Sequence, residues 1–145
     1  MKKVTLFSDG SALGNPGPGG YGTILRFGDK EKEISGSEEH TTNNRMELLA
    51  VIEGLRALKE ACDVEVISDS SYVVKGINEW LVGWVKKDFK KVKNPDLWRD
   101  YLEVASGHKI KGTWVRGHNG HEENERCDIL ARTEAEKIKE LLKEK

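Results

Sequence analysis

The sequence predicts an α/β domain in which helices flank a mixed sheet of about five strands. Three observations favour this class. Short apolar runs typical of strands occur near the N-terminus, at residues 64–68 and at residues 110–115. Longer segments in which apolar residues recur every three or four positions separate these later runs. Glycine and proline concentrate between residues 10 and 22, where we expect a loop.

The first three strands are expected to form an antiparallel meander. Residues 4–9 have the apolar character of a strand buried on both faces, and residues 21–27 are the second candidate. A third strand over residues 32–37 and their flanks follows a turn at residues 28 and 29. Connections this short join antiparallel neighbours.

The remainder of the chain alternates between helices and strands. A helix is expected over residues 44–60, because Leu48, Ile52 and Leu55 share one apolar face. This helix makes residues 64–68 a candidate parallel strand. The pattern then predicts a helix at 70–80, an irregular aromatic and basic segment at 81–97, a helix at 97–106, a strand at 110–115, a polar loop at 117–123 and a helix at 126–145.

The composition is that of a globular protein, and we expect residues 1–145 to form a single domain, with 37% hydrophobic and 34% charged residues. A net charge of −1 excludes a uniformly basic surface but allows a local basic patch. Cys62 and Cys127 match no metal or redox spacing and suit a reducing compartment. Without a signal-peptide pattern or a membrane-length apolar run, a cytoplasmic protein with no membrane association is expected. A single apolar stripe on the last helix favours a monomer.

Four acidic residues lie at the ends of predicted elements. Asp9 and Asp69 end strands, whereas Glu47 and Asp128 lie near helix starts. Each acid also has a local alternative. Asp9 could form a turn with Gly10, and Glu47 could be the partner in a helix-capping arrangement. Asp69 could be a helix N-cap, and Asp128 could be a first-turn charge that suits the helix dipole. If all four converge, each close pair repels by about 4 kcal/mol at an effective dielectric near 20. The free energy of unfolding is only about 5–15 kcal/mol, so the combination predicts a bound divalent cation.

Four blocks of sequence resemble type 1 ribonuclease H. They are DGS at residues 9–11 with GNPGPGGYG at 14–22, TTNNRMEL at 41–48, SDS at 68–70, and GHNGH at 117–121 with ENERCD at 123–128. The blocks follow the order of that family and extend over most of the chain. The resemblance implies a ribonuclease H-like fold, with three antiparallel strands, then two parallel strands, and flanking helices. It also implies hydrolysis of the RNA strand of RNA–DNA hybrids, leaving 5′-phosphate and 3′-hydroxyl ends.

The resemblance also assigns roles to the acids. By motif position, Asp9 would bridge two Mg²⁺ ions, with Mn²⁺ as an alternative metal. Glu47 and Asp69 would complete the ion near the leaving group, and Asp128 the ion that holds the attacking water. Carboxylate oxygens are the ligands that Mg²⁺ prefers. His118 would shuttle a proton or assist product release; the alternative is an ordinary surface-loop histidine.

A further set of residues matches the family's contacts with the hybrid. They are Gly10, Ser11, Asn15, Thr42, Asn43, Asn44, Trp80, Lys86 and Lys87. The resemblance places the three asparagines in the minor groove, Gly10 and Ser11 beside Asp9, Thr42 at a DNA-strand phosphate and Trp80 on a deoxyribose. Only the 2′-hydroxyl distinguishes RNA from DNA at every sugar. Helix capping is the alternative for the asparagines and the threonine.

Basic and aromatic residues alternate between positions 80 and 98. Five lysines at 86, 87, 90, 91 and 93 are interleaved with Trp80, Trp84, Phe89 and Trp98. This segment resembles a shortened form of the family's basic handle, in which lysines contact phosphate and aromatic rings stack. The alternative is a solvated amphipathic face.

Two other functions compete with hybrid cleavage. A non-catalytic hybrid-binding module would need the groove but not all four acids, so their presence argues against it. A DNA-cutting relative such as a transposase or junction nuclease would share fold and metals. The short chain and the NNRME block at residues 43–47 argue against that second alternative.

Overall fold

The computed structural model describes residues 1–117 and 121–144. Its centre is one five-stranded sheet in the order β3-β2-β1-β4-β5. The strands are β1 (Lys2–Ala12), β2 (Gly17–Phe27), β3 (Lys30–Thr41), β4 (Cys62–Ser68) and β5 (Lys109–Trp114). β2 pairs antiparallel with β1 and β3, whereas β4 pairs parallel with β1 and β5. The predicted mixed sheet, three antiparallel strands followed by two parallel ones, is confirmed.

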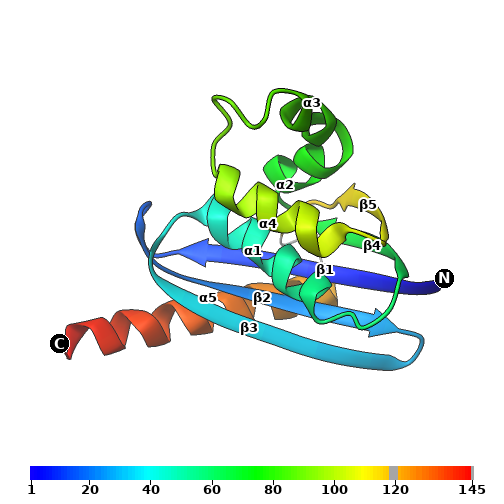
Figure 1. Ribbon diagram of the computed structural model, residues 1–145. Coiled ribbons are helices and arrows are strands. Elements are labelled where there is room, and N and C mark those ends of the chain that lie inside the picture. Colours follow the sequence, from blue (N-terminus) through cyan, green and yellow to red (C-terminus); the bar gives the residue numbers. More distant parts are fainter. Residues whose placement is uncertain (118–120, 145) are drawn as a thin grey trace.

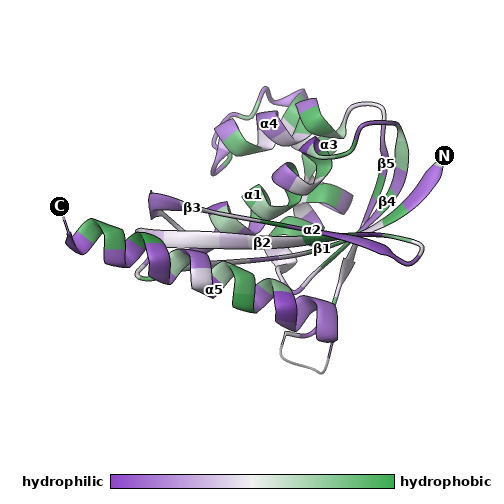
Figure 2. Ribbon diagram, turned by 90° about the horizontal axis from the view of Figure 1, so that it is seen from below, coloured by the Kyte–Doolittle hydropathy of each residue, from purple (hydrophilic) through white to green (hydrophobic). Residues whose placement is uncertain are grey.

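Helices cover both faces of the sheet (Figure 1). They are α1 (Asn43–Arg56), α2 (Ser71–Lys75), the π-helical η1 (Gly76–Trp80), α3 (Leu81–Lys86), α4 (Pro95–Ala105) and α5 (Glu122–Lys143). Figure 2 shows α5 on one side of the sheet and α1, α3 and α4 on the other. No helix in the described part of the chain is long and apolar enough to cross a membrane.

The main core lies between the sheet and α1. Leu48, Ile52 and Leu55 are almost completely buried there, which confirms the apolar face predicted for this helix. Val64 and Val66 of β4 belong to the same core. The alternation of buried and half-buried residues along β4 follows from the period of two in a strand.

The predicted loop over residues 10–22 is wrong for most of its length. β1 continues to Ala12 and β2 begins at Gly17, so only residues 13–16 connect them. The glycines allow close packing here: a Cβ on Gly20 would lie 2.4 Å from the carbonyl oxygen of Ala131, and one on Gly22 would lie 2.6 Å from that of Cys127. Both carbonyls belong to α5, so these glycines let that helix approach the sheet closely.

Several helix boundaries also differ from the prediction. α1 ends at Arg56 rather than near residue 60, because the chain turns back toward β4, and Glu60 pairs with Lys2 on β1 at 2.7 Å. Residues 81–86, predicted to be irregular, form α3, and the ring of Trp84 packs against Trp98 at a centroid distance of 5.1 Å. α5 begins at Glu122, four positions earlier than predicted, and acids in its first turn suit the helix dipole.

Candidate active site

The parallel pairing of β1 with β4 brings Asp9 and Asp69 together. Val4 pairs with Val64 and Phe7 with Ile67, and this register extended by two residues places Asp69 beside Asp9. Both acids therefore lie side by side where β4 ends at Ser68, although β1 continues beyond Asp9 to Ala12. Ser70, not Asp69, is the N-cap of α2, because its side chain accepts a hydrogen bond from the backbone amide of Val73.

Close packing of α1 on β1 adds Glu47 to this pair. A Cβ on Gly10 would lie only 2.3 Å from the backbone nitrogen of Glu47, so only glycine allows the helix to come so near. The Gly10 amide donates to Oε1 of Glu47 at 2.7 Å and to Oδ1 of Asp9 at 2.9 Å. The alternatives of a turn at Gly10 and a capping role for Glu47 are both excluded, since β1 continues and Thr42 is the N-cap of α1.

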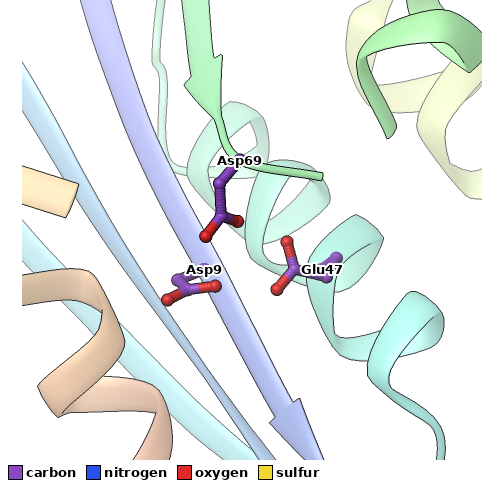
Figure 3. Close-up of side chains that lie close together, drawn as sticks. All are labelled: Asp9, Glu47 and Asp69. Carbon is purple, nitrogen blue, oxygen red and sulfur yellow. The ribbon is translucent and has the colours of Figure 1, made fainter. Parts of the chain in front are cut away.

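The three carboxylates form a tight cluster (Figure 3). One oxygen from each of Asp9, Glu47 and Asp69 lies within 4.8 Å of the others. Asp128 lines the same cavity, which has a volume of about 450 Å³, but stands outside this group of three. Its Oδ2 accepts a hydrogen bond from Nε of Arg132 at 2.9 Å, one turn further along α5.

The electrostatics of the cluster favour a cation. Burial raises the pKa of Asp9 to about 6, and the charges of Asp69 and Asp128 add to this, although hydrogen bonds with Glu47 and Gly10 oppose it. Burial, followed by the charge of Asp9, raises the pKa of Glu47 well above its ordinary value. Oε2 of Glu47 is buried without a hydrogen-bond partner among the described residues. A buried carboxylate oxygen with no donor, beside two more carboxylates, suits a hard divalent ion.

The last residue of β5 and the chain that follows it lie against Asp69. The indole Nε1 of Trp114 donates to the carbonyl oxygen of Asp69 at 2.9 Å and so anchors the end of β4. Gly117 lies so close to Asp69 that a Cβ on it would be 2.6 Å from Oδ2. Sequence reasoning missed Trp114, although its place at the end of the strand next to Asp69 was a usable signal. His118 lies outside the described residues.

Residues predicted to contact the hybrid surround the acids. Gly10, Asn43 and Asn44 line the same cavity. Oδ1 of Asn43 accepts from the amide of Ala12 at 2.7 Å, and Oδ1 of Asn15 accepts from the amide of Asn43 at 3.1 Å. These bonds fix the loop after β1 against the start of α1.

Thr42 and Ser11 flank this group. Oγ1 of Thr42 accepts a hydrogen bond from the amide of Arg45 at 3.2 Å, so the capping alternative is confirmed for Thr42. α1 begins at Asn43, so Asn43 and Asn44 lie inside the helix rather than at its N-cap. Ser11 lies on β1, paired with Gly20 of β2.

The basic segment projects above the sheet at the top of Figure 1. Lys86 and Lys87 are exposed at the end of α3, and Trp80 is 40% exposed. Phe89 and Trp98, predicted among the aromatic residues available for stacking, are instead buried in the core. The aromatic enrichment therefore reflects mainly the packing of this segment on the domain.

Comparison with known proteins gives a consistent assignment. The family model described as RNase H matches residues 1–136. A protein of Sulfurovum sp. (strain NBC37-1) named Ribonuclease H is 70% identical over 138 residues, which are 95% of this chain and 94% of that protein. Among solved structures, LC9-RNase H1, described as a type 1 RNase H with the type 2 active-site motif, matches with a TM-score of 0.87 and 33% identity over 95% of this chain and 74% of that one. LC11-RNase H1 in complex with an RNA/DNA hybrid matches with a TM-score of 0.68 and 25% identity over 92% of this chain and 97% of that one.

Proposed function

Because the chain belongs to the RNase H family, we propose that Asp9, Glu47, Asp69 and Asp128 hold two Mg²⁺ ions with which it hydrolyses the RNA strand of RNA–DNA hybrids. The observation that carries this proposal is the convergence of three carboxylates within 4.8 Å. The buried Oε2 of Glu47 supports it, because no described residue donates a hydrogen bond to that oxygen.

Each acid has a distinct part in this proposal. When bound, the two ions activate the attacking water and stabilise the departing 3′-oxygen. Asp9 would contribute to both ions, with Glu47 and Asp69 on one side and Asp128 on the other. The position of Asp128 outside the tight group, yet on the wall of the same cavity, supports a separate ion there. His118 is proposed as the proton shuttle or as an aid to product release, and Mn²⁺ as an alternative metal.

The hybrid would lie across the acid cavity and reach the basic segment. Asn15, Asn43 and Asn44 would contact the minor groove, with Gly10 and Ser11 next to the scissile phosphate. The hydrogen bond that the Asn43 amide donates to Oδ1 of Asn15 supports a preformed contact surface. LC11-RNase H1, a relative of similar fold, has been solved with an RNA/DNA hybrid.

The outer contacts of the proposed hybrid-binding surface fall into two groups. Thr42 would bind a DNA-strand phosphate close to the cavity. Trp80, Lys86 and Lys87 would contact the hybrid further away, and the exposure of these three side chains supports that role.

We also propose that residues 1–145 act as one domain and as a cytoplasmic monomer. Five strands of one sheet, contributed by segments from Lys2 to Trp114, support a single folding unit. Two buried free thiols, Cys62 and Cys127, suit a reducing compartment.

A cleavage assay tests the assignment. An end-labelled RNA–DNA hybrid, duplex DNA and duplex RNA are incubated with Mg²⁺ or with EDTA, and the products are resolved on a gel. We expect the hybrid to be cleaved in Mg²⁺ and not in EDTA, and we expect neither duplex DNA nor duplex RNA to be cleaved. Asp9→Asn should abolish cleavage, whereas Asp63→Asn, a change at the far end of β4, should not. Tight hybrid binding without cleavage by the wild type would instead indicate a binding module, and cleavage of duplex DNA a DNA-cutting enzyme.

A further inference from the structure

The start of α1 is linked by side chains to the end of the basic segment. The guanidinium of Arg45 donates to both carboxylate oxygens of Asp96, at 3.0 and 2.7 Å. Its Nη1 also lies 3.2 Å from Oδ1 of Asn94. Arg45 follows Asn44 and is two residues from Glu47, so this link starts beside the acid cavity.

A second link starts from α2, which follows Asp69. The hydroxyl of Tyr72 accepts from Nδ2 of Asn94 at 3.1 Å and from Nε1 of Trp98 at 2.8 Å, and it donates to the carbonyl oxygen of Lys93 at 3.4 Å. A hydroxyl has one donor and two acceptor positions, so all three are used. Tyr72 also lines the acid cavity.

Asn94 joins the two links. Its amide oxygen accepts from Arg45 and its amide nitrogen donates to Tyr72. The residue is the N-cap position of α4, but its side chain makes no cap bond and its backbone is left-handed, with φ 56° and ψ 46°. Asparagine tolerates this conformation better than most residues. The basic segment therefore ends at one residue held from both sides.

We propose that Arg45, Tyr72 and Asn94 form a positioning junction that holds the lysine-bearing segment 86–93 at a fixed place relative to the acid cavity. The junction deepens the proposed function and rests on it, because it concerns how the same hybrid is held. Without the junction, the lysines would have to be ordered when the hybrid binds, and that ordering weakens binding. The junction residues act through the segment and not on the reacting atoms.

The variant Asn94→Gly tests the junction directly. Glycine adopts a positive φ without strain, so the change removes the side-chain bonds of Asn94 to Arg45 and Tyr72 and leaves the backbone conformation accessible. We expect KM for a long hybrid to rise about 3- to 10-fold with kcat unchanged. The slope of log KM against log salt should also fall by about one unit, since a loosened segment makes fewer simultaneous phosphate contacts.

A matched control lies in the same segment. Asp88 also has a positive φ, of 53°, and its side chain is almost fully exposed, so Asp88→Gly makes the same backbone change without touching the junction. Loss of its negative charge should leave KM equal or lower. A second test is Arg45→Lys, which retains the charge but loses the two-pronged geometry and should raise KM in the same way.

Three results would overturn the junction. One is an unchanged KM and salt slope for a folded Asn94→Gly, verified by circular dichroism and thermal unfolding. Another is a rise in KM for Asp88→Gly equal to that for Asn94→Gly. The third is a fall in kcat in proportion to the loss of folded protein, which would indicate a purely structural role. Failure of the wild type to cleave the hybrid in the same assay would instead refute the proposed function.

Discussion

The carboxylate of Glu47 accepts a hydrogen bond from Gly10 at one oxygen and has no hydrogen-bond partner among the described residues at the other. Oε1 accepts a hydrogen bond of 2.7 Å from the backbone amide of Gly10, whereas Oε2 is buried without a partner among the described residues. The first contact ties α1 to β1. The second oxygen belongs to a side chain that clusters with those of Asp9 and Asp69, and it leaves negative charge that a bound cation would neutralise.

Glu47→Gln should show separately how the Glu47 charge affects the free energy of unfolding and how it affects cleavage. The amide can keep the bond from Gly10 but carries no charge, so the metal-free free energy of unfolding should rise by about 1–2 kcal/mol. Mg²⁺-dependent cleavage should fall at least about 100-fold, as expected when a metal ligand is lost. Urea unfolding in EDTA and initial rates in Mg²⁺ measure the two effects. Glu53→Gln, on the same helix and paired with Arg56, is the control; if it lost as much activity, the special role of Glu47 would be refuted.

The stability of the metal-free protein should depend on the ionisation of Asp9. Its pKa is raised to about 6, so the native state holds this proton more tightly than the unfolded chain. The resulting stabilisation is complete below about pH 4 and is lost as the pH rises through about 6. Relative to Asp9→Asn, the wild type should therefore lose up to about 3 kcal/mol between about pH 4 and pH 7.

Urea titrations of both proteins in EDTA across this pH range measure that difference. Comparing the two cancels the titrating groups that do not interact with Asp9, whereas the pKa of Glu47, which the charge of Asp9 raises, should fall in Asp9→Asn. Added Mg²⁺ should reduce the difference at neutral pH, because the ions bind the ionised carboxylate. Parallel stability curves for the two proteins would contradict the expected burial of Asp9.

Gly10→Ala should disrupt the contact between α1 and β1. The added Cβ would lie 2.3 Å from the backbone nitrogen of Glu47, which no rotamer change can relieve. We expect the free energy of unfolding to fall by about 1–3 kcal/mol or more and cleavage to be lost as Glu47 moves. Gly83→Ala is the matched control: it lies in α3 with no atom near its Cβ and should stabilise the protein by about 0.5–1 kcal/mol. Equal changes in the free energy of unfolding for Gly10→Ala and Gly83→Ala would contradict close packing of α1 on Gly10.

Arg132→Ala should strengthen metal binding. Arg132 pairs with Asp128 at 2.8 Å and is 60% exposed, so it competes with a cation for that carboxylate. Its removal should lower the Mg²⁺ concentration for half-maximal activity about 2- to 5-fold, the value of an exposed ion pair. Lys137→Ala, whose lysine pairs with Glu134 on the same helix, should leave that concentration unchanged. A higher Mg²⁺ requirement for Arg132→Ala would show that the arginine assists the site.

The double change of Lys86 and Lys87 to alanine should reduce the salt dependence of hybrid binding. Each lysine that contacts a phosphate contributes about 0.9 to the slope of log affinity against log salt, so the slope should fall by about 1–2. Fluorescence anisotropy of a labelled hybrid in Ca²⁺ or EDTA measures it without cleavage. The same double change at Lys137 and Lys143, on the distant half of α5, should not alter the slope. An unchanged slope for the first pair would mean that these lysines do not touch the hybrid.

The local pattern of residues determined the type of most elements and the chemistry of the candidate site. Apolar runs ending in Asp9 and Asp69 identified the strands that carry both acids, because the strand pattern depends only on neighbouring residues. The prediction that both acids end strands is correct for Asp69, which follows the last residue of β4, and wrong for Asp9, since β1 continues to Ala12. The apolar face of Leu48, Ile52 and Leu55 identified α1 for the same reason. The blocks that resemble type 1 ribonuclease H implied three antiparallel strands followed by two parallel ones.

Tertiary structure decided what the glycines and aromatic residues do. Gly20 and Gly22 belong to a stretch that predicted a loop, yet both pair within β2, and α5 packs directly on them. Phe89 and Trp98 resembled a stacking surface, yet both are buried. The meeting of Glu47 with Asp9 required the strand register and the approach of α1 to Gly10. Such convergence depends on contacts between segments far apart in the chain, and no local pattern of side chains encodes those contacts.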